Sequence, residues 1–295
     1  MASHFRAVGF PAGQVDEVQD LLARAGERAQ ETVEHEDGRT LHYEDPAGAT
    51  LAIHLGGDGD FECCQPGFAG ASRLRWRPLQ VVRDAKGCRF CDLVYAELLD
   101  EDDEMVYPFA LTIETMGATR SLIPYGDPGE VRFAGLWEEG EVWADEAAFE
   151  RAQEAEWGDV SPPEAPGLEL PALRGFASRS LIPSGTFAVD DGGEVSSHVI
   201  AHGIVVSVEE RRTKLDDAPF RVVRLDTLGG VFETCLAPGT IERDELLAPG
   251  AVARATLWLV GRPLTLRERP GPVPTAEPER RSLLGRLFGG RSRGA

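Results

Sequence analysis

The sequence predicts a mainly β protein with a small α+β module at the N-terminus and two related, barrel-like β units in tandem. Residues 108–117 and 219–229 share a Pro-Phe start followed by alternating apolar positions. Further matches follow in the same order: Gly67-Phe68 with Gly175-Phe176, and Leu136-Trp137 with Leu257-Trp258. The offset drifts only from 108 to 121 residues, as small loop insertions in a copied unit would produce. Two unrelated β domains with similar strand-and-turn sequences are the alternative.

The composition is that of a soluble globular protein. The chain has 295 residues, of which 42% are hydrophobic, and no run of eighteen apolar residues. Its first residues lack a basic-then-apolar signal pattern, so a cytoplasmic location is expected. A formal charge of -20 repels phosphate backbones, which makes nucleic acid an improbable partner.

The first 55 residues read as a βαβββ module. Residues 4–10 alternate and predict a strand. The apolar positions between Val15 and Ala25 follow helical spacing. Short strands are expected at 31–33 and 40–43, and a third at 49–55 after the turn 45–48.

This order, with the turn Asp45-Pro46-Ala47-Gly48 before the last strand, resembles one half-module of the vicinal oxygen chelate (glyoxalase-like) family. Members of that family place metal ligands on the first and last strands. The resemblance therefore implies His4 and His54 as metal ligands. Solvent-facing histidines on two strands are the alternative interpretation.

Residues 56–66 predict a Gly- and Asp-rich linker, and residues 67–143 the first β unit. Its strands are expected at 73–83, 92–98, 107–115, 121–123, 131–137 and 141–143. The turn 99–104 holds five acids, but it lacks the spaced ligands and the glycine of a calcium loop. We interpret this turn as a solvated hairpin tip.

Residues 144–172 predict a helix followed by a linker. The helix is expected at 145–157, with Asp145 as its cap. The sequence Ser161-Pro162-Pro163-Glu164-Ala165-Pro166 cannot continue a helix or a central strand, which makes it the clearest domain boundary.

Residues 173–267 predict the second β unit, with strands at 176–182, 195–209, 220–227, 230–236 and 251–260. The long second strand carrying Gly203 and the short linking segment 242–247 resemble an oligonucleotide/oligosaccharide-binding (OB) barrel. That resemblance implies a groove that binds single strands or sugars.

The five cysteines allow two interpretations, a zinc site or buried thiols. Cys88 and Cys91 have the two-residue gap of a zinc knuckle, but adjacent Cys63 and Cys64 lack the spacing of a second pair. Buried thiols are the simpler interpretation.

Residues 268–295 predict a Pro-rich tether and a short basic amphipathic peptide. Such a peptide is typical of a docking segment for a partner's groove or an acidic membrane surface. The docking residues are expected to be Leu283, Leu284, Arg286, Leu287 and Phe288.

The sequence contains no Ser-His-Asp pattern, phosphate-binding glycine loop or zinc hydrolase motif, so we assign no catalytic residue and no cofactor. The leading hypothesis is a non-enzymatic binding or scaffold protein with a protein partner. One alternative is a metal-dependent glyoxalase-like enzyme that uses the N-terminal module. The other is single-strand nucleic-acid binding by OB-like barrels.

Overall fold

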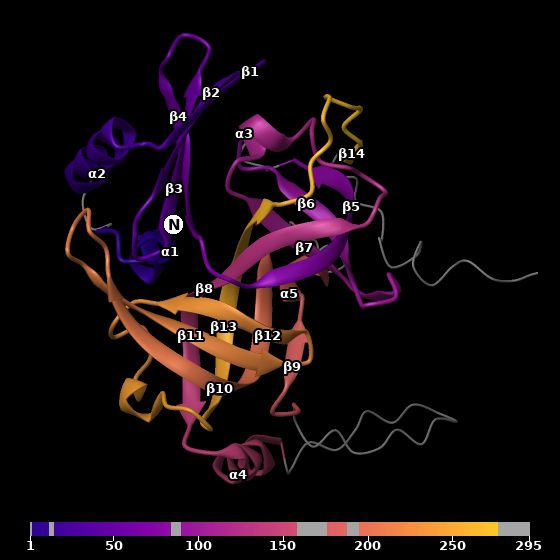
Figure 1. The fold of residues 1–295 in the computed structure, drawn as a ribbon. Helices are drawn as coiled ribbons and strands as arrows, with labels where there is room; N and C mark the ends of the chain where they lie inside the picture. Colours follow the sequence, from indigo (N-terminus) through magenta and orange to yellow (C-terminus); the bar gives the residue numbers. More distant parts are fainter. Residues whose placement is uncertain (1, 12–14, 84–89, 158–175, 188–194, 277–295) are drawn as a thin grey trace, which may run out of the picture.

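A computed structural model describes residues 2–11, 15–83, 90–157, 176–187 and 195–276. It confirms a mainly β protein, with a four-stranded antiparallel sheet and a large mixed sheet (Figure 1). Within these ranges, no helix has both the length and the apolar character needed to cross a membrane.

The N-terminal part consists of two helices and the smaller sheet. Its sheet has the simple order β1-β2-β3-β4, with each strand antiparallel to the next. The elements in chain order are α1 (Ala2–Ala7), α2 (Val15–Glu27), β1 (Glu31–His35), β2 (Gly38–Glu44), β3 (Ala49–Gly56) and β4 (Phe61–Phe68).

The prediction of a strand at residues 4–10 is wrong, because helix α1 covers residues 2–7. Phe5 and Val8, three residues apart, are both buried, which suits one helical face better than strand alternation. The amides of Val8 and Phe10 then close a turn on the carbonyl of Phe5. The βαβββ order is therefore wrong as well, and the resemblance to the vicinal oxygen chelate half-module lacks its first strand.

The linker predicted at residues 56–66 is also wrong in its second half, where β4 begins at Phe61. β4 is the edge strand of the smaller sheet, and Pro66 lies opposite Leu51 of β3. A proline lacks the amide hydrogen that a central strand needs, but an edge strand tolerates it. Gln65 and Pro66, which suggested a loop, therefore lie within a strand.

The large sheet is built from two successive sets of four strands. In each set, three antiparallel strands form a meander and the fourth returns to pair with the first. The first set is β5 (Arg73–Val82), β6 (Leu93–Leu99), β7 (Met105–Ile113) and β8 (Gly129–Trp143); the second is β10 (His198–Arg212), β11 (Pro219–Thr227), β12 (Gly230–Leu236) and β13 (Val252–Pro263).

Short elements complete the fold. The strand predicted at 121–123 is wrong, because that segment is a turn after α3, whereas the segments 131–137 and 141–143 join into β8. The helix predicted at 145–157 is present as α4. The remaining elements are α3 (Met116–Thr119), α4 (Glu146–Trp157), β9 (Ser180–Ile182), α5 (Ser184–Phe187), the 3₁₀ turn η2 (Asp244–Leu246) and β14 (Thr275–Ala276).

The two sets interlock through β8 and β13. These two strands pair antiparallel over the whole of β13, from Val252 opposite Trp143 to Pro263 opposite Val131. β7 joins β13 in parallel, and β12 joins β8 in parallel. Each set thereby closes into a partial ring of strands, and the two rings share β8 and β13 (Figure 1).

The sequence repeat matches this arrangement only in part. Leu257 lies opposite Trp137, and Trp258 lies opposite Leu136, so the two matching dipeptides face each other on corresponding strands. Pro108, however, belongs to the third strand of its set, whereas Pro219 begins the second strand of the other. The Pro-Phe match therefore does not follow the strand order.

The two sets share one hydrophobic core. Its buried residues come from both sets and include Trp76 and Phe109 of the first and Leu225 and Phe232 of the second. A second cluster lies under the N-terminal helices and contains Phe5 and Leu51 together with Phe220 of β11. The smaller sheet is thus packed onto the large one.

Candidate functional site

Three arginines form a row across the large sheet where it meets the smaller one. Arg132 of β8 lies directly opposite Arg73 of β5 and directly opposite Arg262 of β13. Residues opposite each other in a sheet share one face, and like charges in such positions repel. The row therefore requires negative partners.

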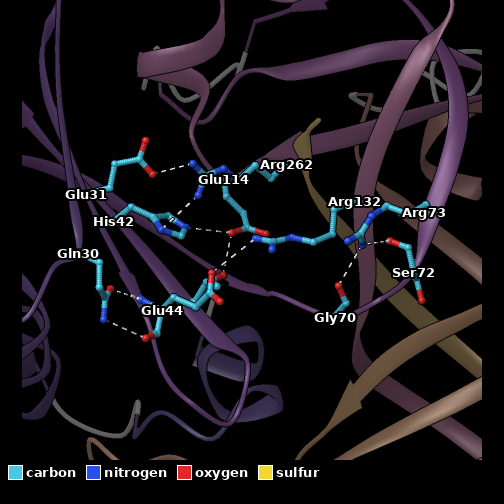
Figure 2. Close-up of polar contacts among 11 residues, drawn as sticks. Gln30, Glu31, His42, Glu44, Gly70, Ser72, Arg73, Glu114, Arg132 and Arg262 are labelled. Carbon is cyan, nitrogen blue, oxygen red and sulfur yellow. Dashed lines mark hydrogen bonds and ion pairs between the residues drawn. The ribbon is translucent and has the colours of Figure 1, made fainter. Parts of the chain in front are cut away.

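Those partners come mainly from the smaller sheet, as Figure 2 shows. Arg262 contacts Glu31 of β1 at 2.6 Å, and Arg132 lies 4.0 Å from Glu44 of β2. Arg73 instead donates to two backbone carbonyls, those of residues 70 and 72, at 3.1 and 3.0 Å. Arg262 and Arg132 thus face acids of the smaller sheet, while Arg73 caps the connection between β4 and β5.

Glu114, which follows β7, is the buried carboxylate of this interface and is only 1% exposed. Thr50 donates a hydrogen bond to its Oε2 at 2.7 Å, and His42 Nε2 lies 3.7 Å from the same oxygen. Figure 2 shows the carboxylate between His42 and Arg132. Burial alone would raise the pKa of Glu114, but His42, Thr50 and Arg132 together bring it below its ordinary value.

Gly67 of β4 provides the space for that carboxylate. A Cβ atom at Gly67 would lie 2.2 Å from the Cδ atom of Glu114, well inside van der Waals contact. Glu114 therefore packs directly against the backbone of β4. This close approach explains why a residue with no side chain stands at position 67.

His54, predicted as a metal ligand, lies in the same interface and is fully buried. Its Nδ1 is 3.0 Å from the hydroxyl of Thr40, and its ring stacks on Phe90 with centroids 4.9 Å apart. Burial, with smaller contributions from His35 and His42, lowers the pKa of His54 to about 4. The imidazole is therefore neutral near pH 7.

His4, the other predicted ligand, belongs to a different cluster. His4 Nε2 lies 2.8 Å from Oε1 of Glu138, and His198 Nε2 lies 2.9 Å from Oε2 of the same carboxylate. Trp258 contacts both imidazole rings, with centroids 4.7 and 4.8 Å away. Contacts with His198 and His4 hold the pKa of Glu138 well below its usual range.

The structure thus gives His4 and His54 separate sets of partners and does not place them around one ion. In the ranges that the structure describes, no three His, Cys, Asp or Glu side chains form a group that could hold a metal. Both histidines instead connect neighbouring elements: His4 joins α1 to β8, and His54 joins β3 to β2 through Thr40.

Sequence reasoning missed Glu138 and its link to His198. Ser196 lies 2.8 Å from Nδ1 of His198, so a serine, an imidazole and a carboxylate stand in line as in a hydrolase relay. The order is reversed, however, because in a serine hydrolase the serine bonds Nε2 of the imidazole and the carboxylate bonds Nδ1. We therefore interpret this line as structural. Glu138 lies about 60 residues before Ser196 and His198, and no local motif links it to them.

The cysteines give no further site among the described residues. Cys63 and Cys64 lie on β4, and burial, followed by the nearby Cys91, raises the pKa of the Cys64 thiol to about 12. Cys64 is therefore a neutral thiol near pH 7 and not a nucleophile. Cys88 lies outside the described residues, so a zinc knuckle formed by Cys88 and Cys91 stays a prediction from the sequence.

Comparison of the chain with protein-family models finds no match, and comparisons with curated proteins and with solved structures find none either.

Replacing Gly67 with alanine should destabilise the protein by about 2 kcal/mol, because overpacking displaces the buried Glu114 carboxylate from Thr50. Gly57→Ala is the matched control, since a Cβ there would meet nothing within 4 Å. Urea unfolding of both variants measures the difference. Equal stability of the two variants would contradict the packing of Glu114 on β4.

Replacing Glu138 with glutamine should lower the free energy of unfolding at pH 7 by about 1–2 kcal/mol, because two charge-assisted contacts are lost. The pKa of Glu138 is depressed below 4.5 in the folded chain. Its stabilisation is therefore complete above about pH 5 and disappears as the pH falls through the folded-state pKa. Urea unfolding from pH 7 to pH 3 should show the gap between the variant and the original chain narrowing below about pH 5 without closing, because the folded-state pKa lies well below this range.

Glu139→Gln is the control for that series, because Glu139 is the exposed neighbour of Glu138 and accepts a hydrogen bond from the hydroxyl of Thr256, at 3.2 Å. A gap that is unchanged at pH 3, or one as large for Glu139→Gln, would show that the Glu138 contacts add no stability.

Proposed function

We propose that this chain is a non-enzymatic binding protein that holds a protein partner on the ends of two hairpins. The observation that carries the proposal is an exposed apolar area at those ends, which we call the hairpin-end surface. Large apolar side chains gathered on a surface mark interaction sites more often than isolated ones do. Its members and their exposed fractions are Met105 46%, Val106 47%, Leu228 70% and Val231 45%.

The two hairpins lie against each other. Leu228 is in the tight turn between β11 and β12, and the next residue, Gly229, approaches Tyr107 of β7. A Cβ at Gly229 would lie 2.7 Å from the Tyr107 hydroxyl and 3.0 Å from Leu181 of β9. The turn therefore reaches the side chain of Tyr107, the residue that directly follows Met105 and Val106 in β7. On this basis we group the four apolar side chains as one surface.

An acidic rim borders this surface and favours a positively charged partner. The turn 100–104, directly before Met105, carries five carboxylates, and Arg75 pairs with that of Asp103. The Asp100 carboxylate holds the turn by accepting the amides of residues 102 and 104, each at 2.9 Å. A peptide that combines apolar and basic side chains would complement both parts.

The same features weigh against the two alternatives. A glyoxalase-like metal site would need His4 and His54 at one ion, but each has its own separate partners. Single-strand nucleic-acid binding would need a basic surface, whereas the hairpin ends are bordered by acids. The docking segment with Leu283 to Phe288 lies outside the described residues and remains part of the proposal.

The proposal includes a duplication of one barrel-like unit as the origin of the two strand sets. It is supported by their equal strand order and by the facing dipeptides Leu136-Trp137 and Leu257-Trp258. In this view each copy supplies one hairpin end, and the binding surface arises where the copies meet.

Replacing Leu228 with aspartate should reduce recovery of the protein partner at least tenfold, because a charge would enter the centre of the apolar area (about 1.4 kcal/mol or more). Affinity capture with the full chain, quantified by mass spectrometry, measures the loss. Phe61→Asp is the control, since Phe61 is 53% exposed on β4, in the other sheet. A partner set that Leu228→Asp leaves unchanged would overturn the proposal.

A further inference from the structure

The central arginine of the row, Arg132, has two buried nitrogens, Nε and Nη2, with no hydrogen-bond partner among the described residues. The arginines on either side differ from it. Arg262 contacts Glu31 at 2.6 Å, and Arg73 donates to two backbone carbonyls. Buried polar groups nearly always have a partner, because a donor that loses water and gains no acceptor destabilises the folded chain. The centre of the row therefore has donors that call for an acceptor.

The two nitrogens of Arg132 form one recognition edge. The Nε–H bond and one Nη2–H bond of a guanidinium lie parallel on the same side of the group, and this edge matches the two oxygens of a carboxylate. The carboxylate of Glu44 comes near it, but Oε2 lies 4.0 Å from Nη2, beyond hydrogen-bond distance. Figure 2 shows the guanidinium reaching towards Glu44 and Glu114. The edge is therefore shaped for a carboxylate that Glu44 does not deliver.

Glu44 can turn away from this edge without disturbing its strand. Its side chain is 47% exposed, whereas that of Arg132 is 14% exposed. The main chain of Glu44 is held separately, because its amide and its carbonyl bond the side chain of Gln30 at 2.8 and 3.1 Å. The carboxylate can therefore move into water while β2 stays in place. This movement would open the edge from the solvent side.

The charges around the edge favour an anion in the place that Glu44 leaves. Arg73 lies opposite Arg132 and contacts only uncharged carbonyls among the hydrogen bonds given above, so the two positive charges add. Arg262 is offset by Glu31. With Glu44 turned outward, the buried carboxylate of Glu114 offsets one of the two remaining charges. One further negative group would then restore neutrality at the edge.

We propose that Arg132 binds the carboxylate of a small organic acid through Nε and Nη2, with Glu44 turned into solvent. The edge is buried between the two sheets and opens only where Glu44 leaves, so a small molecule fits it better than a protein segment does. This binding site goes beyond the proposed function. It uses residues other than those of the hairpin-end surface, so either site can exist without the other.

Titration of the full chain with sodium acetate tests this proposal. The Nε–H signal of Arg132, assigned by triple-resonance NMR, reports directly on the edge. The expected result is a saturable shift of this signal with acetate, and no comparable shift with sodium chloride at the same ionic strength. Failure of the signal to move, or an equal movement with chloride, would overturn the proposal, because the edge would then have no preference for a carboxylate.

Glu44→Gln should lower the half-saturating acetate concentration about threefold, because a neutral amide competes less well for the edge than a carboxylate does. Glu139→Gln is the matched control, since Glu139 is also an exposed glutamate but contacts Thr256 instead. An unchanged half-saturation in Glu44→Gln would overturn the proposal, because the ligand would then not take the place of Glu44. A larger shift with inorganic phosphate than with acetate would overturn the assignment of a carboxylate ligand.

Discussion

The pairing of β8 with β13 is the constraint on which the rest of the structure depends. Each of these strands has further neighbours: β8 pairs with β5 and β12, and β13 pairs with β7 and β10. Both partial rings close through them, so neither ring is complete without strands from the other set. Trp137 strengthens this centre, because its indole nitrogen donates to the hydroxyl of Thr234 at 2.7 Å inside the core.

The smaller sheet is attached to the same two strands. Arg132 belongs to β8 and Arg262 to β13, so their guanidinium groups face the acids of the smaller sheet only when the two strands pair in this register. Burying charges is costly, and a misplaced partner leaves one of them uncompensated. We infer that this polar interface specifies how the sheets dock, while the apolar cluster under the helices provides most of the stabilisation.

A second polar anchor acts at the far side of the interface. The buried carboxylate of Asp45 accepts the amides of Lys214 and Leu215 at about 3 Å, together with the hydroxyl of Tyr43 at 2.8 Å. It thereby fixes the turn between β2 and β3 to the hairpin of β10 and β11. The smaller sheet is thus fixed to the large one at a second point.

Strands with clear alternation, such as β5 and β11, could be predicted from the sequence because one of their faces is buried and the other is not. Residues 4–10 could not, since burial against the large sheet decides their conformation. β4 could not be predicted because it contains Pro66, which is tolerated only on an edge strand, and the edge position of β4 depends on the final strand order. The link between His4, Glu138 and His198 joins three distant segments, and the row of arginines exists only once the register between strands is known.

Native-state hydrogen exchange tests the central claim that β8 and β13 unite both strand sets into one cooperative unit. This claim implies that the slowest amides of β6 and β7 and those of β11 and β12 exchange with one common free energy, equal to that of β8 and β13. It would be contradicted if one set opened at a distinctly lower free energy while the other set stayed protected.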